Sequence, residues 1–195
     1  MTTPLKNTYY GLRHGESEAN VAGLIACDPS TARSGFGLSE QGRVQVQSTA
    51  VTHRAALAGA RVVTSDFARA RQTAELVAHV VELAPPRIDM RLRERWFGDL
   101  EGEPAARYDE VWAHDVADPE HSEFGVEAPT EVVARLSSLI RELEEEHEGE
   151  TVLFVSHGDP LQLLATALAG RCPGTHRELA PWQPAELRRL EGALP

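Results

Sequence analysis

The sequence predicts an α/β protein, a three-layer α/β/α sandwich with a mostly parallel central sheet and a small lid insertion. Two observations lead to this prediction. Short β-prone runs alternate with helical stretches along most of the 195 residues, as in a parallel sheet that helices cover on both faces. Polar residues directly follow several of these runs, as at the carboxyl edge of such a sheet. The length suits one domain over residues 1–195.

The first strand and helix are expected between residues 7 and 59. The β-prone run 7–12 ends where a polar loop begins. In the stretch that starts at Leu38, a helix is expected with Ser39 as its N-cap and its end before Gly59. Its expected apolar face consists of Val44, Val51, Ala55 and Leu57.

A second strand and helix follow at once. The run 60–64 is β-prone and precedes Ser65 and Asp66, which are candidate N-caps. A helix is then expected over 67–81. This order of elements is that of a βα unit, in which a strand leads directly into a covering helix.

The second half of the chain continues the alternation. Strands are expected at 87–92 and 151–155, and the latter run, TVLFV, is the clearest buried strand of the sequence. A helix with one apolar face is expected over 130–147, and another from about 160 to 170. The segment 185–190 either forms a final edge strand or belongs to a stretch that wraps the surface.

Residues 101–129 interrupt the alternation and are expected to form the lid. The stretch contains several glycines and prolines together with aromatic residues, which is typical of a loop-and-helix insertion. Its side chains should decide which substrate is accepted. The candidates are Arg107, Tyr108, Trp112, His114 and His121.

Composition excludes several classes of function. With 30 acidic and 19 basic residues the formal charge is -11, so the surface as a whole repels nucleic acid and anionic lipid. Cys27 and Cys172 lie far apart in the sequence and outside any CxxC pattern, which indicates neither a disulfide framework nor a zinc site. No segment approaches the roughly 20 apolar residues of a membrane span. We expect a cytoplasmic protein with no nucleic-acid or membrane partner.

A His-Gly pair occurs twice, each time just after a predicted buried strand. His14 follows Arg13 in RHGES, and His157 stands in SHGDP. Either pair alone is a common turn sequence and a weak signal. In a parallel sheet, however, both open onto the same carboxyl edge. Two imidazoles and an arginine there suit a tetrahedral anion, with one histidine as nucleophile.

Two further segments follow strand ends. Arg69 and Arg71 fall in the first turns of the helix 67–81, either as anion ligands or as part of a solvated face. Glu94 precedes Trp96 and Phe97. A carboxyl beside these rings is either desolvated and kept protonated as a general acid, or it is a salt-bridged surface group.

Taken together, these segments resemble the histidine phosphatase superfamily, which includes phosphoglycerate mutase-like proteins. The match runs from Tyr10 to about Leu164, with five blocks in the family's order. They are LRHGESEAN (12–20), LSEQGRVQ (38–45), SDFARARQTA (65–74), LRERWFGDLEG (92–102) and VSHGD (155–159).

The resemblance implies a role for each matching residue. His14 would be the nucleophile that forms a phosphohistidine, while Arg13, Arg69 and His157 would hold the phosphoryl oxygens. Glu94 would protonate the leaving group. The neighbouring arginines should lower the pKa of His14, and its other ring nitrogen should donate to a backbone carbonyl near Gly15. Neither a metal ion nor a cofactor is implied.

Four further substrate contacts are expected. Ser17 and Asn20 match positions that line the phosphate pocket in relatives. Arg95 follows Glu94 as in the acid loop of mutases, and Arg107 lies in the lid. Arg71 is then left as a charge on the helix surface.

The chain departs from the family pattern at two places. In GVEAPTEVVAR (125–135), Val126 and Ala128 stand where many relatives have Gly and Ser. Asp159 and Pro160 follow the second His-Gly pair, where relatives usually have small residues. Asp159 either steers substrate choice or caps the next helix, and the preference of Asp for N-caps favours the cap.

The expected activity is hydrolysis of small phosphate monoesters. Only 63 positions separate Glu94 from His157, and this short interval favours a phosphatase over a mutase, which usually has a longer insertion. Phosphoglycerate mutase-type transfer remains an alternative, as does a noncatalytic module that binds a phosphorylated ligand. HExxH and GxSxG motifs are absent, which disfavours a metal centre and a serine hydrolase. A homodimer through an edge strand is compatible with the sequence.

Overall fold

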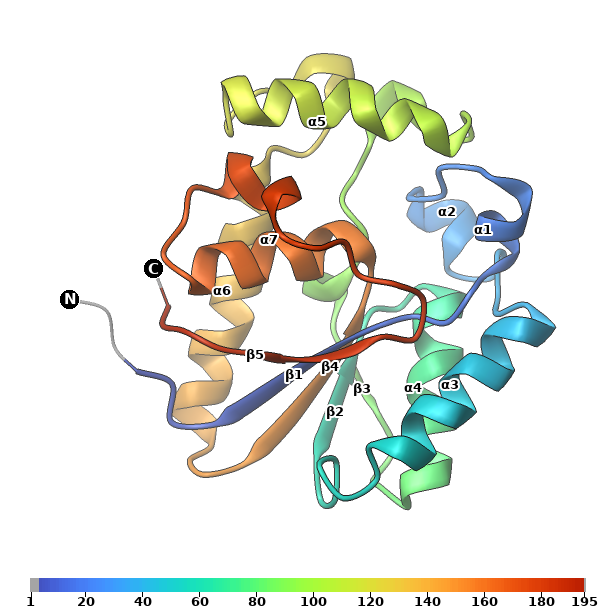
Figure 1. The fold of residues 1–195 in the computed structure, drawn as a ribbon, viewed down its shortest axis with the longest axis vertical. Coiled ribbons are helices and arrows are strands. Elements are labelled where there is room, and N and C mark those ends of the chain that lie inside the picture. The colour runs from blue at the N-terminus through green and yellow to red at the C-terminus, as the bar shows by residue number, and fades with distance from the viewer. Residues whose placement is uncertain (1–3, 195) are drawn as a thin grey trace.

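The computed structural model describes residues 4–194 and is built around one five-stranded sheet. The remaining residues of the expected domain 1–195, the first three and Pro195, lie outside the described part. The strand order is β3-β2-β4-β1-β5 (Figure 1). The strands are β1 (Thr8–Arg13), β2 (Arg61–Thr64), β3 (Arg87–Ile88), β4 (Thr151–Ser156) and β5 (Leu187–Leu190).

The register of the central strands brings two polar loops together. β1, β4, β2 and β3 are parallel, and only β5 runs antiparallel to its neighbour β1. Arg13 at the end of β1 lies opposite Ser156 at the end of β4. The residues that follow these two strands, His14 and His157, therefore leave the sheet side by side at its carboxyl edge.

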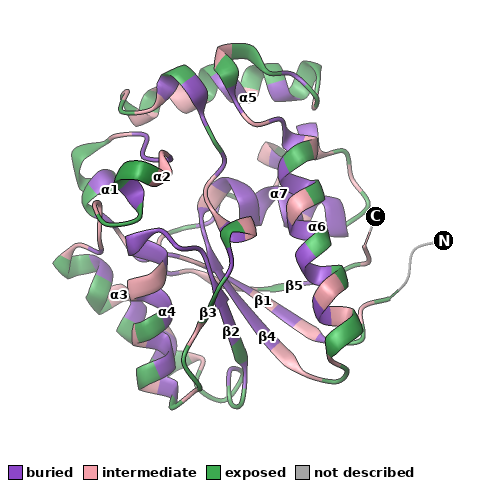
Figure 2. Cartoon of the chain, turned by 180° about the vertical axis from the view of Figure 1, so that it is seen from behind, coloured by how far each residue is buried: buried purple, intermediate pink, exposed green. Residues whose placement is uncertain are grey.

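Helices cover both faces of the sheet, which confirms the three-layer sandwich. On β4, Val152 and Phe154 pack into one core cluster with α6 and α7, whereas Leu153 and Val155 pack into the other with α3 and α4. This alternation is the two-residue period of a strand. Figure 2 shows the buried strands between the two helical layers. The covering helices are α3 (Glu40–Thr52), α4 (Ala68–Val81), α6 (Pro129–Glu146) and α7 (Gly158–Leu168).

The predicted lid segment, residues 101–129, is a mixture of loops and short helices. Its one long helix, α5 (Tyr108–Ala117), lies across the top of the molecule in Figure 1, above α7. A third core cluster, with Phe97, Leu100 and Val111 among its members, packs beneath it. The short helices of the chain are α1 (Glu18–Ala22), α2 (Pro29–Ala32) and the 3-10 turns η1 (Met90–Leu92), η2 (Gly98–Leu100), η3 (Ala105–Arg107), η4 (Glu123–Gly125) and η5 (Pro173–Glu178).

Two predicted elements are shorter than expected. The helix predicted over the residues before Gly59 ends at Thr52 and continues as turns. The strand predicted over 87–92 ends at Ile88, because the Asp89 carboxylate accepts a hydrogen bond from the backbone N–H of Arg91 and starts the turn η1. Conversely, the undecided segment 185–190 does contain an edge strand, β5.

Of the four residues predicted for the apolar face of this helix, Leu57 is buried but lies beyond the end of α3, and the other three are exposed. Val44 and Val51 are 57% and 62% exposed, whereas Val46 and Ala50 are fully buried. Gly42 sets this orientation, since a Cβ on it would lie 2.0 Å from the carbonyl oxygen of Glu16. The helix therefore turns Gly42 and Val46, and not Val44 or Val51, toward the loop after β1.

Within residues 4–194, no helix is both long enough and apolar enough to cross a bilayer.

Candidate active site

The loop after β1 is held against α3 and begins the site. A Cβ on Gly15 would lie 2.6 Å from the carbonyl oxygen of Gly42, so the two backbones touch through their glycines. Ser17 then caps α1, and its hydroxyl accepts the backbone N–H of Asn20. These contacts fix the backbone that follows His14.

His14 is 3% exposed, and each of its two ring nitrogens has its own hydrogen-bond partner. Nδ1 lies 2.7 Å from the carbonyl oxygen of Gly15, to which it donates. Nε2 accepts a hydrogen bond of 3.1 Å from Nε of Arg69. Burial, and then the charges of Arg69 and Arg13, hold the pKa of His14 well below its usual value. The ring is therefore neutral, with its lone pair on Nε2, as the sequence led us to expect.

His157 lies next to His14, with 5.2 Å between the ring centroids. Its Nε2 is 3.0 Å from the hydroxyl of Ser65, while the buried Nδ1 has no hydrogen-bond partner within residues 4–194. Burial and the charge of Arg69 lower the pKa of His157 well below its usual value. This second imidazole is thus neutral and has one nitrogen free.

Arg13 and Arg69 bring two guanidinium groups to the same place. Nη1 of Arg13 donates to the carbonyl of Trp182 at 2.5 Å, and Nη2 of Arg69 donates to that of Ala26 at 2.8 Å. Each guanidinium keeps one buried nitrogen without a partner in the described chain, Nε of Arg13 and Nη1 of Arg69. Unsatisfied buried donors are rare and costly, so they indicate an anion-binding site.

Glu94 is half-buried and lies between two cavities. Its Oε1 accepts the backbone N–H of Arg95 at 3.0 Å. Burial, and then the negative charge of Asp159, raise the pKa of Glu94 to about 7. The carboxyl is therefore able both to give and to take a proton near neutral pH.

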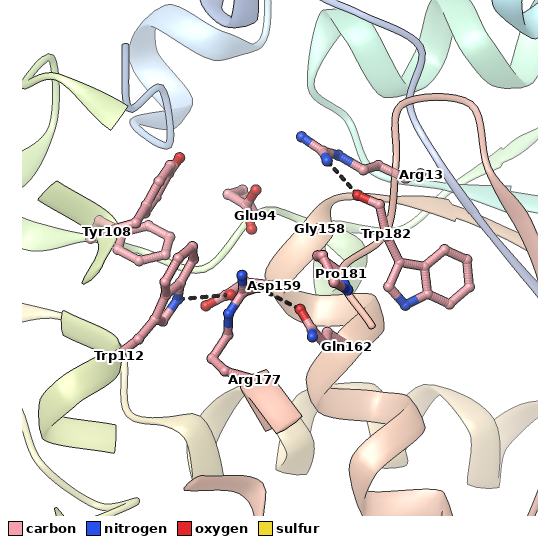
Figure 3. A pocket seen from close by; sticks show the side chains of 11 residues that line it. Arg13, Glu94, Tyr108, Trp112, Gly158, Asp159, Gln162, Arg177, Pro181 and Trp182 are labelled. Atoms are coloured by element: carbon pink, nitrogen blue, oxygen red, sulfur yellow. Dashed lines mark hydrogen bonds between the residues drawn. The ribbon is translucent and has the colours of Figure 1, made fainter. Parts of the chain in front are cut away.

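Two cavities meet at Arg13, Glu94 and Tyr108, which line both. The first, here named the His14 cavity, has a volume of about 90 Å³ and is also lined by His14 and Arg69. The second, the lid cavity, has about 160 Å³, and Tyr108 and Trp112 of α5 are among the residues that line it (Figure 3). A group bound at His14 can thus extend past Glu94 into the lid cavity.

Comparison with known proteins agrees with this geometry. A profile of the histidine phosphatase superfamily (branch 1) matches residues 9–193. The chain belongs to the histidine phosphatase superfamily.

Relatives within this superfamily include both phosphatases and mutases. The chain is 34% identical over 167 residues to the adenosylcobalamin/alpha-ribazole phosphatase of Salmonella typhimurium, covering 80% of this chain and 77% of the relative. It is 29% identical over 168 residues to the probable phosphoglycerate mutase GpmB of Proteus mirabilis, covering 83% and 74%. The structure of mycobacterial glucosyl-3-phosphoglycerate phosphatase with VO3 matches with a TM-score of 0.79 at 26% identity, covering 93% of this chain and 90% of that chain.

Of the four further residues expected to touch substrate, two lie at the His14 cavity. Asn20 and Ser17 both line it, although Ser17 is fully buried and engaged as the cap of α1. Asn20 is exposed and therefore the more accessible of the two in this histidine phosphatase.

Arg95 and Arg107 do not lie where a substrate contact was expected. Arg95 is fully buried, and both of its Nη atoms donate to the carboxylate of Asp115 at 2.7 and 2.8 Å. Arg107 lines neither cavity and forms ion pairs with Glu103 and Glu110. Arg95 is thus a structural cation beneath the lid, and Arg107 is a surface charge.

Asp159 does not cap α7, contrary to the preference inferred from its position. His157 is the N-cap, and Asp159 lies in the first turn with its side chain turned toward the lid. Its Oδ1 accepts the indole N–H of Trp112 at 3.0 Å, and its Oδ2 lies 3.3 Å from Nη1 of Arg95. Asp159 therefore joins α7 to α5 and lines the lid cavity.

The two residues expected to cap α4, Ser65 and Asp66, bind other side chains instead. Phe67 is the N-cap. Ser65 contacts Nε2 of His157, and Asp66 accepts two hydrogen bonds of 2.7 Å from Arg93. No sequence signal marked Ser65 as a partner of His157, because the pairing joins positions 92 residues apart.

The sequence analysis also missed residues near the end of the described chain. Trp182 supplies a backbone carbonyl to Arg13, and Arg177 and Gln162 line the lid cavity. A backbone carbonyl has no signature in sequence, and the stretch after Cys172 matches the family poorly. Within residues 4–194, no group of three or more His, Cys, Asp or Glu side chains is placed to hold a metal ion.

Proposed function

We propose that this protein hydrolyses small phosphate monoesters through a phosphohistidine at His14. One observation supports the proposal most directly. Near Nε2 of His14, which accepts a hydrogen bond from Nε of Arg69, three buried nitrogens lack partners in the described chain: Nε of Arg13, Nη1 of Arg69 and Nδ1 of His157. Such a set matches the three non-bridging oxygens of a phosphoryl group.

In the first step, Nε2 of His14 attacks phosphorus, and the bond from phosphorus to the ester oxygen breaks. The two arginines spread their positive charge over the phosphoryl oxygens. The proton of Glu94 passes to the departing oxygen, so the alcohol leaves neutral and Glu94 becomes a carboxylate. The hydrogen bond from Nδ1 of His14 to Gly15 stabilises the positive charge that the ring acquires.

In the second step, water attacks the phosphohistidine. Glu94, now a carboxylate, takes a proton from this water, and the bond between phosphorus and Nε2 breaks. Phosphate leaves, and both His14 and Glu94 return to their starting forms. A carboxyl whose pKa is about 7 suits both steps because neither protonation state is strongly disfavoured at neutral pH.

The test is phosphate release from a panel of esters by the wild type and by His14→Ala, in the presence of EDTA. We expect the variant to lose activity by several orders of magnitude and to retain no label from a radiolabelled ester. His79→Ala, at an exposed position on α4, is the matched control and should behave as the wild type. Equal turnover by His14→Ala contradicts the proposal.

The same experiment separates the two alternatives. Phosphoryl transfer is supported by the relative named a probable phosphoglycerate mutase. Transfer between positions of a phosphoglycerate that exceeds phosphate release would establish it. Binding of esters without any turnover would establish a noncatalytic module. A homodimer and a cytoplasmic location stay predictions of the sequence.

A further inference from the structure

We propose that Arg177 recognises a carboxylate on the alcohol part of the substrate, so that the preferred substrates are phosphate monoesters of short hydroxy acids. This inference rests on the proposed function, because it assigns the part of the ester that leaves. It concerns the lid cavity, whose side chains the two catalytic steps do not use apart from Arg13 and Glu94.

Arg177 is held rigidly in the wall of this cavity. It belongs to η5, and its Cζ lies 3.6 Å from the ring centroid of Trp112. Its Nη1 donates to Oε1 of Gln162 at 2.6 Å, and the amide of Gln162 is itself fixed by donating to the carbonyl of Leu179 at 2.8 Å. Figure 3 shows the guanidinium between Trp112 and Gln162. Such a preorganised group loses little freedom when it binds an anion.

The edge of Arg177 formed by Nε and Nη2 is left without a partner. Neither atom makes a hydrogen bond or ion pair within residues 4–194. Elsewhere in this chain the same edge binds carboxylates in a fork: Arg93 holds Asp66 with two bonds of 2.7 Å, and Arg188 holds Glu186 with two bonds of 2.7 Å. The fork of a guanidinium matches the two oxygens of a carboxylate.

The carboxylate of Asp159 does not fill this role, although it lines the same cavity. It lies within 4 Å of Arg95 and His176 but not of Arg177. Its two oxygens are engaged by Arg95, Trp112 and His176. The cation of Arg177 therefore faces the cavity with its charge uncompensated by a direct ion pair.

The aromatic residues of the cavity are less suited to recognising a substrate. Trp112 is covered by Arg177 and by Tyr108, which stacks on it at 5.3 Å with an interplanar angle of 11°. Trp182 and Phe97 are 2% and 0% exposed. A nucleobase would find no free ring face without displacing Arg177, whereas a carboxylate finds a prepared partner.

The two cavities place the ester in one orientation. With phosphorus at His14, the ester oxygen lies at Glu94, and the remaining carbon chain enters the lid cavity. A volume of about 160 Å³ is close to that of a cavity that holds benzene, so about six heavy atoms fit beyond the ester oxygen. A carboxylate at the end of a short chain then reaches Arg177.

The test compares two esters that differ only in this group, 3-phosphoglycerate and glycerol 3-phosphate. We expect the wild type to have the higher kcat/KM on the carboxylated ester. In Arg177→Gln, the ratio of kcat/KM between the two esters should fall by about tenfold or more, which is the range for a hydrogen bond to a charged group. Arg177→Lys, which keeps the charge without the fork, should retain part of it. Arg171→Gln, which removes an arginine paired with Glu178 in the same segment, is the matched control and should keep it.

Each outcome decides the question. An equal loss on both esters in Arg177→Gln shows that Arg177 only clamps the lid and overturns the inference, as does a wild type without preference. If Arg177→Gln does not fold, product inhibition of the wild type replaces it: glycerate must inhibit at lower concentration than glycerol. Failure of the proposed function has a different signature, since then neither ester is hydrolysed in a His14-dependent manner.

Discussion

At His14 and Glu94, the same physical factor has opposite effects on the two pKa values. Burial disfavours charge, so it lowers the pKa of the imidazole and raises that of the carboxyl. The nucleophile is therefore neutral and the acid protonated over a shared range of pH below about 7. The charges of Arg13 and Arg69 reinforce the first effect, and that of Asp159 reinforces the second.

This pairing predicts the pH dependence of the first step. The reactive form needs neutral His14 and protonated Glu94. Above the Glu94 pKa of about 7, kcat/KM should fall about tenfold per pH unit. The acidic limb should lie well below pH 6.5, since the His14 pKa is lowered. A profile of kcat/KM between pH 4 and 9 checks this, and an alkaline limb near pH 4.5, the ordinary range of a carboxyl, would contradict it.

Asp159→Asn should move the alkaline limb to lower pH. The carboxylate of Asp159 raises the pKa of Glu94, and the amide removes this charge while still accepting from Trp112. The measurement is the same profile of kcat/KM. Asp109→Asn, on the exposed side of α5, serves as control and should leave the profile in place. An unshifted limb in Asp159→Asn would assign the pKa of Glu94 to burial alone.

Sequence reasoning succeeds at residues that follow strands and fails at residues whose partners come from the lid. His14 and His157 were expected to meet because parallel strands deliver their next residues to one edge. Arg95 and Asp159 carry no such constraint. Their burial depends on how α5 docks, and the contacts to Asp115 and Trp112 join positions that no local pattern connects.

Among the elements, α3 shows how one glycine couples a helix to the site. Alanine normally stabilises a helix interior relative to glycine by about 0.5–1 kcal/mol. In Gly42→Ala, however, the new methyl meets the carbonyl of Glu16, a backbone group that cannot turn aside. The loop that carries His14 must then shift.

We therefore expect Gly42→Ala to lower both kcat/KM and the free energy of unfolding. Ser48→Ala, at an exposed position of the same helix, should leave activity unchanged and stability equal or slightly higher. Steady-state kinetics and urea denaturation of both variants check the expectation. A more stable and fully active Gly42→Ala would show that the loop does not depend on this contact.

The spacing of apolar residues predicts the buried face of a helix better where apolar burial alone determines that face. The predicted apolar face of α6 is buried and includes Val132, Leu136, Leu139 and Ile140. For α3, the same reasoning chose Val44 and Val51, which are exposed. There the close approach of Gly42 to the loop determines the face, and glycine contributes nothing to an apolar pattern.

At the scale of the whole molecule, a buried ion network joins the lid to the sandwich. Arg95 follows Glu94, Asp115 belongs to α5, and Asp159 lies in the first turn of α7. Three separate segments thus contribute charged side chains that are buried together. His121 adds a contact of 2.6 Å to Asp115. Removing one partner of such a network leaves a buried charge uncompensated.

Asp115→Ala should therefore destabilise the protein by about 3–5 kcal/mol, the usual cost of breaking a buried pair. Chemical denaturation checks this. The control is Glu110→Ala on the same helix, which removes an exposed ion pair with Arg107. It should leave the unfolding midpoint nearly unchanged. Equal effects of the two substitutions would show that the network does not stabilise the docked lid.

The antiparallel strand β5 determines when during synthesis the site becomes complete. The backbone N–H of Ala185 donates to the carbonyl of His14, that of Arg13 donates to Glu186, and the carbonyl of Trp182 holds the Arg13 side chain. A nascent chain exposes the nucleophile early but receives these supports only after residues 182–186 have been made. Catalytic competence should therefore appear abruptly, once this segment leaves the ribosome and β5 joins the sheet, and nascent chains that lack it should be inert.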